Sequence, residues 1–176
     1  MAYTFLAAKG YQVGTSLLEA NQIETVKGYL AQAEKAGVEI VLPTDVVVAD
    51  TFTADSPHDV VPADAIPAGR TGLDIGPDSA KLFASKIADA KTIVWNGPMG
   101  VFEMKPFEAG TREVAVAVAR NNKAVSVIGG GDSVAALKKF GLEERVTFVS
   151  TGGGASMKLL EGVPLPGVEA LKDTLG

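Results

Sequence analysis

The chain has 176 residues, of which 47% are hydrophobic and 21% charged, values typical of one folded domain. Its net charge of −5 disfavours nucleic-acid binding, which needs a basic face, and the absence of cysteine excludes disulfides, thiolate metal sites and cysteine nucleophiles. We recognise no signal peptide and no apolar run near the roughly 20 residues that span a bilayer, so we expect a cytoplasmic protein that does not contact a membrane.

Helical and strand-like segments alternate along the chain. In chain order, the first half is predicted to contain a helix at 1–9, a helix from Asn21 to Gly37, strands at 38–42, 46–50 and 71–75, and a helix from Pro77. The second half is predicted to contain strands at 91–95, 124–128 and 146–149, helices at 107–120, 132–140 and 154–161, and one helical turn in the tail after 163.

Three of these assignments depend on particular residues. Asn21 and Glu24 have the spacing of a capping box, so we expect them to bind the first turn of the second helix. Residues 51–70 contain prolines, several aspartates and the only histidine, His58, and are predicted to be a long loop or an excursion at a sheet edge. The alternating VAVAVA sequence within 107–120 also fits a strand, but the segment's length and alanine content favour a helix.

The near-continuous apolar strands predict an α/β fold with three layers, in which a mostly parallel, Rossmann-like sheet lies between helices. We find no linker that divides the chain, so residues 1–176 are predicted to form a single domain. In open sheets of this kind, ligands bind at the carboxyl ends of the strands. The turns that follow the strands are therefore the first places to look for a site.

Two glycine runs lie in equivalent turns of the predicted sheet. Gly129–Gly131 follows the strand at 124–128, and Gly152–Gly154 follows the strand at 146–149; each run precedes a helix. Glycine lets the backbone approach a phosphate closely, and the N–H groups at a helix start point at an anion. The alternative is that such turns simply tolerate glycine, but two of them at successive strand ends favour a phosphate site. Neither matches GxGxxG or GxxxxGK[ST], which disfavours dinucleotide oxidoreductases and P-loop proteins.

Asp132 and Ser133 follow the first glycine run. Asp132 is a candidate ligand for Mg²⁺ bound to nucleotide phosphates, and Ser133 is a candidate phosphate donor. Both residue types are also common helix N-caps, and the two roles are compatible. The segment 95–103, WNGPMGVFE, offers a rigid turn, apolar side chains and the carboxylate of Glu103. It fits a wall for adenine with an acid for ribose hydroxyls, or else a structural turn with a solvated glutamate.

These segments resemble the phosphoglycerate kinase family. The resemblance rests on WNGPMGVFE, GGGDSVAAL, STGGGAS and GLDIGP, together with residues 1–5 and 16–19, and it extends over essentially the whole chain. The resemblance implies a transferase of glycolysis that moves a phosphoryl group between 1,3-bisphosphoglycerate and ADP with Mg²⁺. It also implies two hinged domains, of which the C-terminal one binds ATP or ADP and corresponds to this chain.

The resemblance also implies a role for each matching residue. Glu103 would hold the ribose hydroxyls, Asn96 would lie near the phosphates, and Asp132 would face Mg²⁺. Adenine would be bound by Gly72, Leu73, Pro98 and Val101. The phosphates would be bound by Gly130, Gly131, Asp132 and Ser133. The helix that begins after Thr151, Gly152, Gly153 and Gly154 would stabilise the phosphoryl group during transfer.

Parts of the family pattern are absent from this chain. The N-terminal domain, which would bind 3-phosphoglycerate, is missing, and so is the start of the C-terminal domain with its phosphate-binding lysines. We therefore expect little or no turnover by this chain alone, and a non-catalytic nucleotide-binding or folding fragment remains the alternative. The resemblance implies a monomeric parent enzyme. A fragment that lacks a sheet strand is expected to expose an edge and apolar surface, and therefore to be marginally stable or to self-associate.

Overall fold

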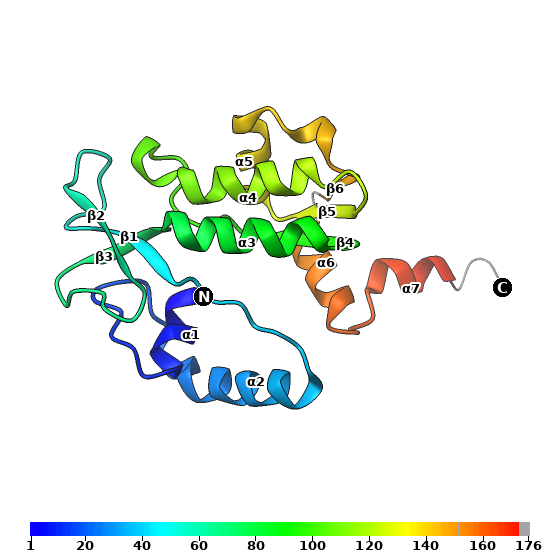
Figure 1. Ribbon diagram of the computed structural model, residues 1–176. Helices are drawn as coiled ribbons and strands as arrows, with labels where there is room; N and C mark the ends of the chain where they lie inside the picture. Colours follow the sequence, from blue (N-terminus) through cyan, green and yellow to red (C-terminus); the bar gives the residue numbers. More distant parts are fainter. Residues whose placement is uncertain (151, 173–176) are drawn as a thin grey trace.

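The computed structural model describes residues 1–150 and 152–172 (Figure 1). The α-helices are α1 (Ala2–Ala8), α2 (Ile23–Ala36), α3 (Pro77–Asp89), α4 (Ala109–Arg120), α5 (Gly131–Phe140), α6 (Gly153–Leu160) and α7 (Pro166–Lys172). Short 3₁₀ turns are η1 (Ala20–Gln22), η2 (Lys105–Phe107) and η3 (Glu143–Arg145). The strands are β1 (Asp45–Ala49), β2 (His58–Pro62), β3 (Thr71–Ile75), β4 (Thr92–Asn96), β5 (Val125–Gly129) and β6 (Phe148–Ser150).

The second half of the chain forms a parallel sheet with the order β4-β5-β6, in which Trp95 is level with Ile128. Helices α4 and α5 cover one face of this sheet, and Figure 1 shows α3 running alongside α4. The core on this face consists of apolar side chains from both strands and helices, including Ile93, Trp95, Val114 and Leu137. The α/β class with a parallel sheet flanked by helices is therefore confirmed.

The other face of the parallel sheet carries exposed apolar side chains. Val94, Val125 and Phe148 are 45%, 53% and 60% exposed. Val94 pairs with Val127, which in turn pairs with Phe148, so these side chains share one face. Helix α6 approaches this sheet at the end of β5, where Gly153 packs on the backbone of Gly130. Exposed apolar surface of this kind marks a region available for association.

The first half of the chain forms a second sheet that was not predicted. This sheet has the order β2-β1-β3, and both pairings are antiparallel. All five residues of β1 are buried: Val46 and Val48 contact the core around Leu6 of α1, whereas Val47 and Ala49 contact Leu73 and Phe107. The fold thus combines one parallel sheet and one antiparallel sheet.

Two predictions for the first half of the chain are wrong. Residues 38–42 are not a strand, because they pair with no other strand in the described part of the chain. Within this segment, Leu42 packs on the core around Val46 and Leu6, whereas Val38 is 60% exposed. Asn21 does not cap α2, because it lies within η1 and α2 begins two residues later without a side-chain cap. The partner expected for that cap, Glu24, pairs with Lys27 instead.

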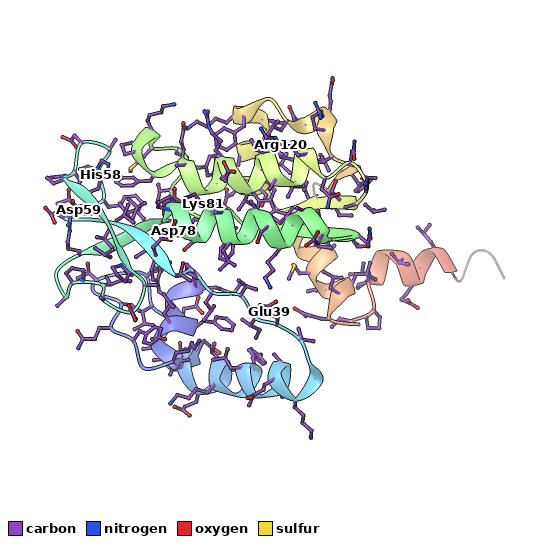
Figure 2. The ribbon with its side chains drawn as sticks, viewed as in Figure 1. Glu39, His58, Asp59, Asp78, Lys81 and Arg120 are labelled. Carbon is purple, nitrogen blue, oxygen red and sulfur yellow. The ribbon has the colours of Figure 1, made fainter. Side chains whose placement is uncertain are left out.

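The irregular stretch 51–70 contains one regular element. β2 lies within it, at the outer edge of the antiparallel sheet, as the alternative of an edge excursion had indicated. His58 and Asp59 lie there at the periphery of the molecule (Figure 2). Both are exposed, and Asp59 pairs with Arg70. The other predicted helices and strands lie within two residues of their predicted positions. The exception is the tail, where one helical turn was predicted and α7 has seven residues.

Candidate functional site

A cavity of about 750 Å³ opens between the antiparallel sheet and the turn after β4. Five of the residues predicted to bind nucleotide line it: Gly72, Leu73, Asn96, Pro98 and Val101. These residues come from β3 and from the segment after β4, so the two halves of the chain meet at this cavity. Several further lining residues were not predicted: Tyr3, Phe52, Phe83 and Met99. Met99 belongs to the segment 95–103 that was predicted as an adenine wall, although it was not assigned a role by itself. Tyr3, Phe52 and Phe83 come from other segments, and nothing in the sequence around them indicated a place in this cavity.

Gly72 lies where β3 faces helix α1. A Cβ atom at this position would collide with the hydroxyl oxygen of Tyr3, so any larger residue would force the tyrosine to move. The hydroxyl of Ser16 accepts a hydrogen bond of 2.9 Å from the backbone N–H of Gly72. Burial, together with the nearby charge of Asp74, raises the pKa of Tyr3 above its usual range. Tyr3 therefore presents a neutral phenol to the cavity at physiological pH.

The segment Gly97–Val101 forms one wall of the cavity and is held from several sides. Gly97 has a φ of +105°, a conformation that favours glycine, and its carbonyl accepts a 2.6 Å hydrogen bond from the indole of Trp95. The hydroxyl of Ser133 accepts a 2.6 Å hydrogen bond from the N–H of Gly97. At the other end of the segment, the N–H of Val101 donates to the carbonyl of Leu73 at 2.8 Å. The wall is thus fixed without being part of a helix or a strand.

The two glycine turns lie against each other. Gly130 links β5 to α5 with a φ of +85°, and Gly153 is the first residue of α6. A Cβ atom on Gly153 would come within 2.5 Å of the backbone nitrogen of Gly130, so the close contact requires glycine. Both helix N-termini therefore meet at one place, where their dipoles favour an anion.

Asn96 joins the cavity to the glycine turns. It is the last residue of β4 and lines the cavity. Its side-chain oxygen lies 2.6 Å from the place that a Cβ atom on Gly130 would occupy. At this end of the parallel sheet, the cavity and the glycine turn at Gly130 are therefore separated by no more than the side chain of Asn96.

The remaining predicted residues are placed as follows. Asp132 is exposed in the first turn of α5, whereas Ser133 is fully buried and holds Gly97. Glu103 is exposed two residues beyond Val101 and does not line the cavity. Gly131, Gly152 and Gly154 lie at the starts of α5 and α6, and Thr151 lies outside the described residues. The roles proposed for these residues remain predictions.

A buried carboxyl group adjoins the wall and was missed by the sequence analysis. Asp74 is 1% exposed, and its carboxylate accepts hydrogen bonds from the N–H groups of Gly110 and Ile75. Burial raises the pKa of Asp74 to about 7, although both hydrogen bonds act in the opposite direction. Its place within GLDIGP offered no signal beyond strand character.

A cluster of charged residues around Glu108 lies beside the segment that follows the cavity wall. Glu108 directly precedes α4 and forms ion pairs with Lys105, Lys139 and Arg112. The hydrogen bonds from Lys105 and then Lys139 hold the pKa of Glu108 down at about 2. Lys139, on α5, also donates a 2.5 Å hydrogen bond to the carbonyl of Phe102. This lysine therefore connects α5 to the segment that carries Glu103.

The described residues hold no group of three or more His, Cys, Asp or Glu side chains that would bind a metal ion by themselves. A divalent cation that uses only one protein carboxylate, such as Asp132, would need oxygen ligands from a bound phosphate, which is the usual arrangement for Mg²⁺. Within the same residues, no helix has the length and apolar character needed to cross a bilayer.

A parallel sheet with two glycine turns and a cavity at its carboxyl end is typical of α/β proteins that bind phosphate-containing ligands. The family model for phosphoglycerate kinase matches residues 1–163. The phosphoglycerate kinase of Kineococcus radiotolerans is 58% identical over 172 residues, which are 97% of this chain and 42% of that protein. That of Trichodesmium erythraeum is 53% identical over 173 residues, which are 98% of this chain and 44% of that protein.

The solved structures to which this chain is similar are also phosphoglycerate kinases. Phosphoglycerate kinase from Coxiella burnetii superposes with a TM-score of 0.93 at 42% identity, covering 98% of this chain and 44% of that one. The enzyme from Pyrococcus horikoshii gives a TM-score of 0.72 at 33% identity, covering 97% of this chain and 43% of that one. The chain therefore belongs to the phosphoglycerate kinase family. It spans less than half the length of these relatives.

Proposed function

We propose that this chain is the nucleotide-binding part of a phosphoglycerate kinase, a single C-terminal domain comprising residues 1–176, and that it binds ADP or ATP. The observation that supports this proposal is the position of Asn96, which lines the cavity and also contacts the turn at Gly130. An adenine in the cavity, against Gly72, Leu73, Pro98 and Val101, would have its phosphates directed to this turn.

The phosphates would then meet the starts of α5 and α6. Gly130, Gly131 and Ser133 would bind them through the first turn of α5, while Gly152–Gly154 and Thr151 would stabilise the phosphoryl group in transfer. Catalysis of phosphoryl transfer consists mainly of positioning and of neutralising charge on the equatorial oxygens, and helix N-termini supply part of that charge. Mg²⁺, when bound with the nucleotide, would neutralise further phosphate charge, and Asp132 would hold it.

In this proposal the whole enzyme transfers a phosphoryl group between 1,3-bisphosphoglycerate and ADP in glycolysis, in the cytoplasm. The 3-phosphoglycerate site would be supplied by the portion of the relatives that this chain does not span. By itself the chain would bind nucleotide without turnover. The second candidate, a folding fragment without a nucleotide site, is favoured by the exposed apolar face of the parallel sheet.

Titration calorimetry with Mg–ADP separates the two candidates. Heat of binding that saturates with one nucleotide per chain supports the nucleotide site, whereas no heat at millimolar nucleotide would leave only the folding fragment. A second experiment mixes the chain with a separately produced N-terminal portion of a close relative. Recovery of kinase activity is expected, and its absence from two folded, associating pieces would count against the proposed catalytic role.

A further inference from the structure

Asp74 is a buried carboxyl group on β3. Among the residues that the structure describes, no lysine or arginine forms an ion pair with it or affects its pKa. Carboxylates are rarely buried unless they are paired, because removing a charge from water is costly. Its two hydrogen bonds come only from backbone N–H groups, those of Gly110 at 2.8 Å and Ile75 at 2.9 Å. Ordinary packing does not account for a carboxyl group here.

A bulge in β3 gives Asp74 its direction. Val47 of β1 pairs with Asp74 and Val48 pairs with Gly72, so Leu73 is an extra residue in β3. Neighbouring side chains in a regular strand point to opposite faces, but a bulge changes this alternation. Leu73 packs with Phe107, just before α4, while Asp74 binds Gly110 inside the first turn of the same helix.

The carboxyl group of Asp74 is enclosed by two glycines. A Cβ atom on Gly100, in the cavity wall, or on Gly110, in α4, would collide with it. Glycine within a helix costs about 1 kcal/mol relative to alanine, so its presence at position 110 is consistent with a required close contact. Asp74 therefore lies at the junction of β3, the wall and α4.

Thr111, the residue after Gly110 in α4, binds the cavity wall directly. Thr111 is fully buried, and its hydroxyl accepts hydrogen bonds from the N–H groups of Met99 at 3.1 Å and Gly100 at 3.2 Å. Because Asp74 binds Gly110, it fixes the turn of helix from which Thr111 reaches the wall. This gives one short path from the buried carboxyl group to the cavity.

We propose that Asp74 is a positioning residue for the nucleotide site: it anchors the first turn of α4, and through Thr111 it sets the position of the wall Gly97–Val101. This inference rests on the proposed nucleotide function, because it assigns the wall to adenine. Asp74 itself does not line the cavity and would not touch the nucleotide.

The charge of Asp74 changes near neutral pH, because burial raises its pKa to about 7. Tyr3 of α1 is the titratable group that senses this charge. The other charged residues on the elements packed against Asp74 either bind a different residue or face solvent. Asp45 on β1 binds Ser79, and Glu108 forms ion pairs with Lys105, Lys139 and Arg112. Glu113 is exposed on α4. Ionisation of Asp74 is therefore expected to alter the anchor of the wall.

The only tryptophan of the chain reports on this wall without any ligand. Trp95 donates its indole N–H to Gly97 at 2.6 Å, so its emission depends on where the wall lies. The test compares a reference chain with two variants. Asp74→Asn cannot ionise and keeps one of the two acceptor oxygens, which can bind Gly110, whereas Asp74→Ala removes the acceptors of both Gly110 and Ile75. Asp45→Asn is the matched control, because Asp45 is a buried strand aspartate that accepts backbone N–H groups from α3 instead. The reference chain is the protein with His58→Gln, and every variant carries the same substitution, so that no chain in the comparison contains an imidazole.

Trp95 emission is expected to change with pH around neutrality in the reference chain and in Asp45→Asn, and to stay constant in Asp74→Asn. Calorimetry with Mg–ADP is expected to show binding about tenfold weaker for Asp74→Ala and within about twofold for Asp74→Asn. Thr111→Val should weaken binding as well, and combining it with Asp74→Ala should add less than the sum of the two effects, because both act on one path.

Identical emission profiles for the reference chain and Asp74→Asn would overturn the positioning role, as would unchanged affinity in a folded Asp74→Ala. Equal effects of Asp74→Asn and Asp45→Asn on emission would overturn it too. If Asp74→Ala does not fold, Asp74→Asn and Thr111→Val decide the question. Absence of Mg–ADP binding by the wild type would overturn the nucleotide site alone, because the emission measurement tests Asp74 without nucleotide.

Discussion

The hydroxyl of Ser133 accepts a 2.6 Å hydrogen bond from the backbone N–H of Gly97. The two residues are 36 positions apart, and the bond joins the first turn of α5 to the wall of the cavity. The buried side chain of Ser133 therefore links the parts proposed to bind adenine and phosphate.

Replacing Ser133 by alanine should leave the N–H of Gly97 without a partner. A buried unpaired N–H costs about 1–3 kcal/mol, so we expect a loss of that size in the free energy of unfolding, measured by urea denaturation. Mg–ADP affinity should fall as well. Ser85→Ala, at an exposed serine that binds Leu82 within α3, is the control and should change neither quantity. Equal stability of Ser133→Ala and the wild type would contradict the proposed link.

Glu103→Gln tests the proposed ribose contact. A hydrogen bond to a charged group contributes about 1.5–3 kcal/mol, so removing the charge should weaken ADP binding by about tenfold. The wild type should prefer ADP to 2′-deoxy-ADP, and the variant should lose most of this preference. Glu113→Gln, at an exposed glutamate on α4, should keep it. A variant that still discriminates as the wild type does would show that Glu103 is a solvated surface residue.

Asp132→Asn tests the proposed magnesium ligand. Calorimetry should show weaker binding of Mg–ADP, by about tenfold, and little change for ADP measured in excess chelator. The reason is that the carboxylate would bind the cation and not the nucleotide. Asp89→Asn, at the exposed end of α3, serves as control. A similar loss with and without magnesium would indicate that Asp132 acts only on the start of α5.

Asp74 should make stability depend on pH in a defined direction. Its pKa is raised from 3.8 to about 7 in the folded state, so the folded chain holds this proton more tightly than the unfolded chain. Stability from this group is therefore complete below about pH 4 and is lost as pH rises towards 7. The loss is on the order of 4 kcal/mol, and Asp74→Asn should not show it.

The measurement is the free energy of unfolding across that pH range for both chains. The difference between Asp74→Asn and the wild type should grow with pH between 4 and 7 and then stay constant. Glu108 acts in the opposite sense and in a different range, because its lowered pKa stabilises the folded chain above about 4.5 and this is lost as pH falls towards 2. Parallel curves for the two chains between pH 4 and 7 would contradict the burial effect.

The exposed face of the parallel sheet should cause self-association. Phe148 is 60% exposed on β6 and lies beside Val127 of β5, which in turn pairs with Val94 of β4. Phe148→Ser should shift the sedimentation of concentrated samples towards the monomer, because it removes apolar area from this face. Tyr29→Ser, at a half-exposed side chain on α2, should leave the sedimentation unchanged. Association that is equally strong in both variants would place the contact elsewhere.

Features that depend on neighbouring residues could be predicted from the amino-acid sequence. The glycines that end helices, Gly37 and Gly141, were found in the left-handed conformation that such ends require, and the glycine turns lie where strands lead into helices. The class of fold followed from the apolar strands. Five of the residues assigned to the nucleotide line a common cavity. Local conformation and the pattern of apolar residues depend on residues that are close together in the sequence, so a short stretch of sequence is enough to predict them.

Features that need a partner far away in the chain could not be predicted and became visible in the folded structure. Residues 38–42 have the apolar pattern of a strand, but a strand also needs a neighbour to exchange hydrogen bonds with, and none pairs with them in the described chain. Asp74 is an ordinary acid in sequence and becomes a buried anchor because Gly110, 36 positions away, donates to it. Such contacts depend on how the elements pack, and packing brings together residues whose separation along the chain carries no local signal.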